Sequence, residues 1–184
     1  MKELYLVRHC EAEGQEPEAD LTKRGHLQAE RLAAFFEKID LHMLISSPFV
    51  RAVETAMPIA KLKKLIVKED ERLSERVLSS GDLPDWMDRL KASFADPELK
   101  MTGGESASEA AKRGWEVIEE EAGISGTTVL VTHGNLLALI LKNINPETGF
   151  DEWRALSNPD VYKLCYENNS WAFSRVWTEK AAAE

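Results

Sequence analysis

The segment ELYLVRHCE, residues 3–11, decides the fold, because an apolar run ends abruptly in a basic pair. Residues 3–7 predict a short buried strand. Arg8 and His9 follow that strand directly. In open α/β sheets, ligands bind beyond the carboxyl ends of the strands, so this pair is expected at a binding site.

The rest of the chain alternates predicted strands and helices. Further strands are expected at residues 41–45, 65–67 and 127–132, with a closing hairpin that pairs 161–166 with 171–177 across Asn168-Asn169. Helices are expected from residue 22, from 47 to about 63, over 85–94, from 106 to about 123 and over 136–141. This alternation predicts an α/β fold: a three-layer sandwich with a mostly parallel central sheet flanked by helices.

Local signals mark three of the helix starts. Thr22 is a suitable N-cap for the first helix. Ser47 is expected to cap the second helix, with Pro48 at its first position. Ser106 and Glu109 have the spacing of a capping box at the start of the helix that ends near Gly123.

The 184 residues predict a single domain, with residues 68–104 as an insertion or lid region. That region begins as a polar loop and continues into a helix. Trp86, Met87, Leu90 and Phe94 lie along this helix, and the favoured interpretation is that its apolar side packs on the core. The alternative is that they line the lid and contact an apolar leaving group. Residues 180–184 are expected to be frayed.

Composition excludes several classes of protein. The net charge of −9 argues against nucleic-acid binding, which needs a basic surface. Cys10 and Cys165 form neither a disulfide framework nor a zinc-finger spacing, which favours a reducing compartment. No signal-peptide core or membrane-spanning run is present in the sequence, so a cytoplasmic location is expected.

Two further strand ends carry polar motifs. Ser46-Ser47-Pro48 ends the second strand, with Arg51 one helical turn on, and Thr132-His133-Gly134-Asn135 ends the strand at 127–132. By itself, Arg51 would be read as a solvated surface charge, and a single strand-end histidine as a structural residue. Two histidines and two arginines on one rim of the sheet are improbable as independent accidents. By contrast, His26 and His42 are interpreted as surface residues.

The chemistry of this set favours a phosphate. Guanidinium groups match phosphate oxygens bidentately, and helix N-termini add amide donors. Neutral imidazole is a competent nucleophile near neutral pH. A metal site built from His9, Cys10 and His133 is disfavoured because Arg8 and Arg51 would repel the cation. We expect neither a metal nor a cofactor.

Five segments carry a family resemblance. They are LVRHCEAEG, LTKRGHLQAERLAAFF, SSPFVRAVETA, GGES and VTHGN, which lie in this order between about residues 4 and 140. In this combination the chain resembles the histidine phosphatase superfamily, in its phosphoglycerate-mutase-like branch. The resemblance implies a histidine acid-type phosphatase that acts on a small phosphorylated metabolite.

The resemblance also implies roles for individual residues. His9 would be the nucleophile that becomes phosphorylated, and Arg8, Arg51 and His133 would bind the transferring group. Glu75 would be the proton donor, with Asp70 and Glu71 as rivals. The remaining contacts to phosphate would come from Gln15, Gly134 and Asn135.

The chain departs from the family pattern after the nucleophile. Cys10 stands where glycine or alanine is usual, and a redox role for it stays open. The loop at residues 13–20 is shorter than in mutases, which favours a phosphatase. A mutase and a non-catalytic phosphate-binding module remain alternatives. The substrate and the oligomeric state are open.

Overall fold

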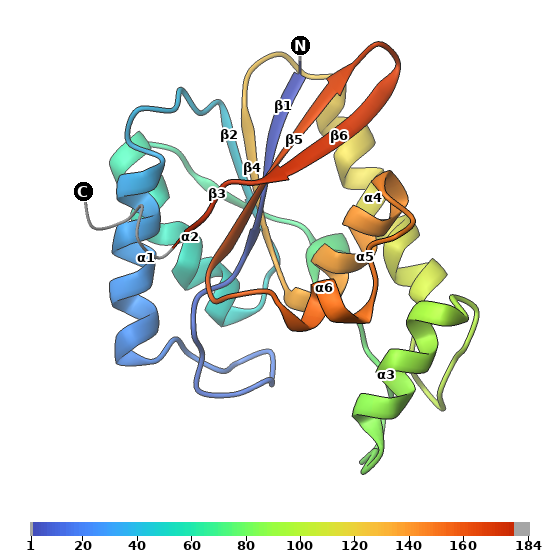
Figure 1. Cartoon of the computed structure of the whole chain (residues 1–184). Helices are drawn as coiled ribbons and strands as arrows, with labels where there is room; N and C mark the ends of the chain where they lie inside the picture. The colour runs from blue at the N-terminus through green and yellow to red at the C-terminus, as the bar shows by residue number, and fades with distance from the viewer. Residues whose placement is uncertain (1, 179–184) are drawn as a thin grey trace.

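The computed structural model describes residues 2–178, and a six-stranded sheet runs through it (Figure 1). The strands are β1 (Lys2–Arg8), β2 (Met43–Ser46), β3 (Val67–Glu69), β4 (Thr128–Thr132), β5 (Asp160–Glu167) and β6 (Ser170–Arg175). Their order across the sheet is β3-β2-β4-β1-β5-β6. The first four are mutually parallel, whereas β5 and β6 pair antiparallel. The predicted mostly parallel sheet is therefore confirmed.

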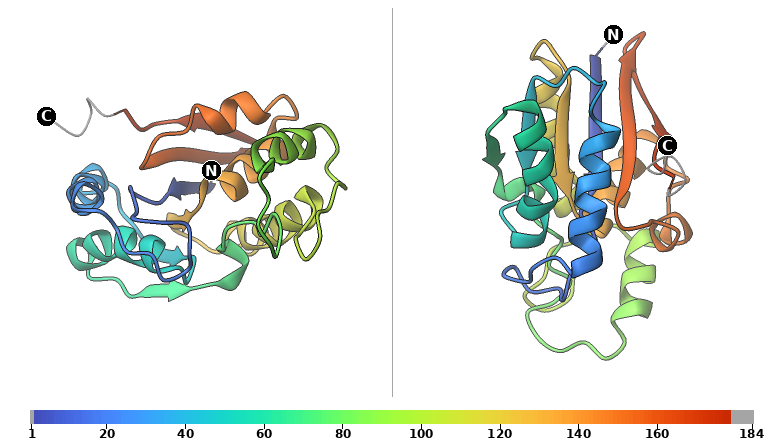
Figure 2. Two further views of the ribbon diagram at one scale, coloured as in Figure 1. Left: turned by 90° about the horizontal axis from the view of Figure 1, so that it is seen from below. Right: turned by 90° about the vertical axis from the view of Figure 1, so that its left-hand side faces the viewer.

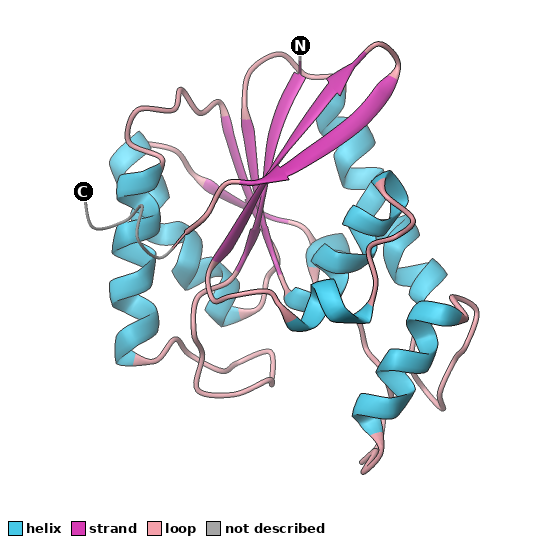
Figure 3. Ribbon diagram, in the orientation of Figure 1, coloured by secondary structure: helices cyan, strands magenta, loops and turns pink. Residues whose placement is uncertain are grey.

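Helices cover both faces of this sheet. They are α1 (Lys23–Phe35), α2 (Val50–Lys63), α3 (Trp86–Ala95), α4 (Ala107–Ala122), α5 (Gly134–Ile144) and α6 (Phe150–Arg154). Figure 2 shows α1 and α2 on one face and α4 and α5 on the other, with α3 and α6 beside them. Figure 3 shows the strands enclosed between these two helical layers. The three-layer α/β architecture agrees with the sequence-based expectation.

The central strand β1 contributes to two separate apolar cores. Leu4 and Leu6 are buried among residues of α4 and α5. Tyr5 and Val7 are buried on the opposite face, among residues of α1 and α2. Because successive side chains of a strand point to opposite faces, an unbroken apolar run is what a strand covered on both sides requires.

Some predicted boundaries differ from the structure. Thr22 and Ser106 do cap α1 and α4, the latter in a capping box. The prediction that α2 begins at Pro48 is wrong, because α2 starts at Val50 and Phe49 occupies the N-cap position. The hydroxyl of Ser47 instead accepts a hydrogen bond from the amide of Phe49 at 3.2 Å.

Residues 68–104 contain more structure than their polar sequence indicated. A short 3-10 turn, η1 (Glu71–Leu73), follows β3 and was not predicted. Outside this region, the short helix α6 was not predicted either. In α3, Leu90 and Phe94 are buried in the core, whereas Trp86 and Met87 are 45% and 40% exposed. The helix thus packs on the core through one side only. The frayed end expected at residues 180–184 lies outside the described residues.

The topology places the site. β1 and β4 are neighbours, but the chain leaves β1 towards β2 on one side and leaves β4 towards β5 on the other. Such a switch point opens a crevice at the carboxyl ends of the strands. In Figure 1 these ends lie at the lower edge of the sheet, where α5 begins. Within residues 2–178, none of the helices has the length and apolar character needed to cross a membrane.

Candidate active site

The two histidines of the strand-end motifs meet at this crevice. His9 follows β1 and His133 follows β4, and their ring centroids are 5.1 Å apart. Both side chains are buried, with exposed fractions of 6% and 0%. Arg51 joins them from the first turn of α2, where its Nε donates to His9 Nε2 at 3.2 Å. Three separate segments of the chain therefore deliver their side chains to one point.

One ring nitrogen of His9 is tied to the backbone. Nδ1 lies 2.6 Å from the carbonyl oxygen of Cys10, which can only accept, so Nδ1 carries the proton. The neutral ring then holds its lone pair on Nε2, the nitrogen that faces Arg51. This tautomer leaves a nucleophilic nitrogen directed at the guanidinium cluster.

Burial keeps both rings uncharged. It lowers the pKa of His9 to about 3, and the charges of Arg51 and Arg8 add to the shift although the bond to Cys10 opposes it. Burial also lowers the pKa of His133 well below its usual value, with further contributions from His9 and the surrounding arginines. At neutral pH, His9 is therefore an uncharged base rather than an imidazolium.

Arg51 is not a surface residue. Its side chain is 1% exposed, and its Nη1 donates to the carbonyl oxygen of Glu16 at 2.8 Å. The guanidinium also lies over the ring of Phe49, 5.0 Å from the centroid. The burial of Arg51 excludes the alternative that it is a solvated surface charge, because the loop at residues 9–22 and Phe49 enclose it.

Arg8 reaches the same crevice from the end of β1. Its Nη1 donates to the carbonyl oxygens of Leu156 and Ser157 at 3.1 and 3.4 Å. Its Nε is buried and has no hydrogen-bond partner among the described residues. A Cβ atom on Gly134 would lie 3.0 Å from this Nε. Gly134 therefore leaves the room that the guanidinium occupies.

Glu75 approaches from the chain that follows η1. Its Oε2 accepts from the amide of Asn135 at 3.0 Å, and its Oε1 accepts from that of Leu136 at 3.0 Å. The carboxylate thus sits on the N-terminus of α5, a favourable place for negative charge. Burial lowers the pKa of Arg8 and Arg51, and the charge of Glu75 opposes both shifts, which places it within electrostatic reach of the pair.

The two rivals of Glu75 are engaged elsewhere. Asp70 receives a bidentate pair of bonds from Arg72, at 3.0 and 2.7 Å. Glu71 accepts a bond from the hydroxyl of Ser74 in an exposed position. Of the three carboxylates, Glu75 is the one that the structure brings to α5 and the arginines.

The two amide side chains differ in their placement. Gln15 is exposed on the loop that follows β1, one residue before Glu16. Asn135 is buried, and neither polar atom of its side chain has a partner among the described residues. A role in phosphate binding stays a prediction for both.

Sequence reasoning missed the segment that supports Arg8 and His9 from the far side of the crevice. The carboxamide of Asn158 donates to the carbonyl oxygen of His9 at 2.8 Å. The buried carboxylate of Asp160 accepts from the amide of Ser157 at 2.9 Å and from Arg175 Nη2 at 2.7 Å. The only available signal was the polar turn sequence Ser157-Asn158-Pro159-Asp160 ahead of a strand.

Cys10 is a packed core residue. It is 0% exposed, and burial raises the pKa of its thiol to about 12. A protonated, enclosed thiol is a poor metal ligand and a poor target for oxidants. Among residues 2–178, no group of three or more His, Cys, Asp or Glu side chains is arranged to hold a metal ion.

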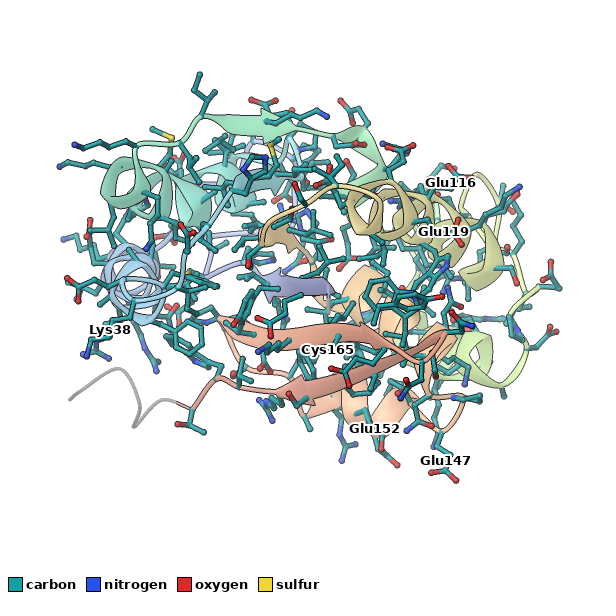
Figure 4. All side chains as sticks on the ribbon, turned by 90° about the horizontal axis from the view of Figure 1, so that it is seen from above. Lys38, Glu116, Glu119, Glu147, Glu152 and Cys165 are labelled. Atoms are coloured by element: carbon teal, nitrogen blue, oxygen red, sulfur yellow. The ribbon has the colours of Figure 1, made fainter. Side chains whose placement is uncertain are left out.

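The charge of the protein is divided between surface and crevice. Figure 4 shows labelled carboxylates that point outward from the helices and loops, among them Glu116, Glu119, Glu147 and Glu152. Arg8 and Arg51, in contrast, are largely or wholly withdrawn from solvent. The molecule is thus a doubly wound α/β protein with two guanidinium groups and a neutral histidine at the carboxyl edge of its sheet, the edge at which such folds bind ligands.

Comparison with known proteins assigns the family. The model of the histidine phosphatase superfamily (branch 1) matches residues 4–178, and the chain belongs to that family. A probable phosphatase of Schizosaccharomyces pombe is 32% identical over an alignment of 157 positions, which covers 76% of this chain but only 55% of that protein. A probable phosphoglycerate mutase of Proteus mirabilis is 25% identical, over 100% of this chain and 94% of its own length.

Solved structures agree with this assignment. A mycobacterial glucosyl-3-phosphoglycerate phosphatase in complex with inorganic phosphate superimposes with a TM-score of 0.78. It is 26% identical, and the match covers 99% of each chain. The predicted family and fold are therefore confirmed.

The uncharged state of His9 leads to a first prediction. Because its folded-state pKa is depressed to about 3, the ring should stay neutral, with the proton on Nδ1, from pH 8 down to pH 5. Nitrogen-15 NMR of histidine-labelled protein measures this directly, with the exposed His26 and His42 as internal references. Protonation of His9 with a midpoint near pH 6.5 would contradict the prediction.

The contact between Gly134 and Arg8 leads to a second prediction. In Gly134→Ala, the new methyl group should displace the guanidinium, so affinity for inorganic phosphate should fall about 10- to 100-fold. Isothermal titration calorimetry gives the dissociation constant. Gly81→Ala is the matched control, because a Cβ there meets nothing within 4 Å. Equal affinities of the two variants would show that Gly134 does not shape the site.

Proposed function

We propose that the protein is a metal-independent phosphomonoester hydrolase that acts through a phosphohistidine at His9. The observation that carries this proposal is the His9 ring itself. Nδ1 is bonded to the carbonyl of Cys10, and Nε2 faces Arg51 with its lone pair. A neutral imidazole fixed in this tautomer beside two cations is suited to attack a bound phosphoryl group.

The phosphoryl group binds among Arg8, Arg51 and His133. Arg8 Nε and His133 Nδ1 are buried without partners among the described residues, and a phosphate oxygen would satisfy each of them. Arg51 Nε donates to His9 Nε2 in the structure. When substrate binds, the phosphorus atom would lie beside His9 Nε2, and Arg51 Nε would donate to a phosphate oxygen instead. The proposal places three further residues around the same anion: Gly134 and Asn135 at the start of α5, and Gln15 on the loop after β1.

Transfer then proceeds in line. His9 Nε2 attacks phosphorus, the P–N bond forms, and the bond to the leaving oxygen breaks. The arginines stabilise the charge spread over the phosphoryl oxygens. This step requires Glu75 to be protonated when the substrate is bound. Glu75 gives that proton to the leaving alkoxide, so the first product departs as an alcohol.

Water completes the cycle. Glu75, now ionised, takes a proton from a water molecule that attacks phospho-His9, and inorganic phosphate is released. Its bonds to the amides of α5 hold the carboxylate in place between the two steps. No metal takes part in either step of the proposal.

The substrate class is a small phosphorylated metabolite. Relatives that carry phosphatase names support hydrolysis, and the short loop after β1 points the same way. The relative named as a mutase supports the second candidate, in which a second hydroxyl of the substrate receives the phosphoryl group. A module that binds phosphate without turnover is the third.

Expectations about domain organisation, cellular location and partners belong to the same proposal. Residues 1–184 would act as one domain, with residues 68–104 as a lid beside the crevice. The enzyme would work in the cytoplasm as an acid-type histidine phosphatase. Its partner would be the small substrate, with no nucleic acid or membrane involved.

Hydrolysis of p-nitrophenyl phosphate at mildly acidic pH, with EDTA present, tests the function. We expect turnover by the wild type, none by His9→Ala, and a loss of about 100-fold or more in kcat/KM for Arg51→Ala. Rapid quenching should trap a phosphorylated protein that is labile to acid and stable to base, and His9→Ala should lack it. Phosphate binding without turnover would support the module, and isomerisation of a phosphoglycerate without net phosphate release would support the mutase.

The role of Glu75 predicts a dependence on the leaving group. In Glu75→Gln, kcat/KM for an alkyl phosphate should fall about 100-fold or more, because its alkoxide needs the proton. The loss for p-nitrophenyl phosphate should be much smaller, since nitrophenolate leaves unprotonated. Glu71→Gln is the matched control and should leave both rates near wild type. Equal losses for the two substrates in Glu75→Gln would exclude Glu75 as the proton donor.

A further inference from the structure

Ser47 lies where β2 leads into α2, and its hydroxyl group makes two contacts. The side chain is 0% exposed. Oγ accepts from the amide of Phe49 at 3.2 Å and lies 2.8 Å from His133 Nε2. The sequence predicts only a helix-capping role for this serine, and capping does not account for its contact with His133.

In the contact between Ser47 and His133, the available protons show that the serine is the donor. A hydroxyl has one proton to donate, and the amide of Phe49 can only donate to it. Ser47 Oγ has no further hydrogen bond among the described residues, so the proton is free for His133 Nε2. In the opposite arrangement, a buried hydroxyl proton would have no acceptor, which costs free energy.

The ring of His133 lies beside the ring of His9, and its second nitrogen is Nδ1. Nδ1 is buried and has no partner among the described residues, and the ring centroid lies 5.1 Å from that of His9. Because burial and the nearby arginines keep the ring uncharged, it carries one proton only. If Nε2 accepts from Ser47, that proton must be on Nδ1.

We propose that Ser47 is a positioning residue that holds neutral His133 in its Nδ1–H tautomer and so makes it a hydrogen-bond donor to the phosphoryl group. The other tautomer would present a lone pair to an anionic oxygen, which is repulsive. The identity of the anion rests on the proposed function. The tautomer itself rests only on the contacts of Ser47 and the burial of His133.

The tautomer can be measured in the wild-type protein. Two-bond nitrogen-15 correlation spectra distinguish a protonated Nδ1 from a protonated Nε2 on each histidine ring. We expect His133 to show a protonated Nδ1 and a lone pair on Nε2 at neutral pH. A protonated Nε2 in the wild type would overturn the proposal, whatever the variants do.

Two neighbouring serines give a matched pair of variants. Ser47→Ala removes the donor to His133, whereas Ser46→Ala removes an equally buried hydroxyl that donates to the carbonyl of Ser47 at 2.8 Å. We expect Ser47→Ala to lose the pure Nδ1–H signal and to weaken inorganic phosphate binding about 10- to 100-fold. Ser46→Ala should keep the signal and bind within about twofold of wild type. Equal behaviour of the two variants would refute the role of Ser47.

A double-mutant cycle tests whether Ser47 acts through His133. If it does, adding Ser47→Ala to His133→Ala should cause no further loss of phosphate affinity. Additive losses would overturn the proposal. Spectra and phosphate titrations need no turnover, so an inactive protein that keeps the tautomer and its dependence on Ser47 would contradict only the proposed hydrolysis.

Discussion

The site depends on one constraint: two guanidinium groups lie in a largely desolvated crevice at the carboxyl edge of the sheet. A cation removed from water needs compensating acceptors, and the protein supplies only some of them. Backbone carbonyls accept hydrogen bonds from one edge of each guanidinium, from Glu16 for Arg51 and from Leu156 and Ser157 for Arg8. The remaining guanidinium donors give a positive potential beside a neutral imidazole, and the proposed binding of phosphate by a protein of net negative charge rests on this potential.

Much of this arrangement could be predicted from the sequence, because it depends on local signals. The apolar run before Arg8 predicts a strand covered on both faces. The carboxyl end of that strand lies at the edge of the sheet where ligands bind in such folds. His9, Arg51 and His133 each follow a strand end, so parallel pairing alone brings them together. The capping residues Thr22 and Ser106 are equally local and were correctly identified.

The sequence could not predict what depends on contacts distant in the chain. The helix α2 begins at Val50 rather than at Pro48, and Ser47 contacts His133, 86 residues away. The helix α6 has only five residues, which is too short for a periodic apolar pattern. The hydrogen bond from Asn158 to the carbonyl of His9 involves a single side chain and leaves no pattern in the sequence. Burial of Arg51 depends on how the loop after β1 folds over it.

The position of β1 within the sheet has a consequence for biosynthesis. This strand is synthesised before its neighbours β4 and β5, and more than a hundred residues separate it from each of them. Pairings of such high contact order form slowly, so β1 cannot complete its hydrogen bonds to the sheet until β4 and β5 have been synthesised. Arg8 and His9 gain their carbonyl and carboxamide partners only when the segment around Asn158 has emerged. A nascent chain therefore cannot complete the crevice before residues 156–158 have been synthesised.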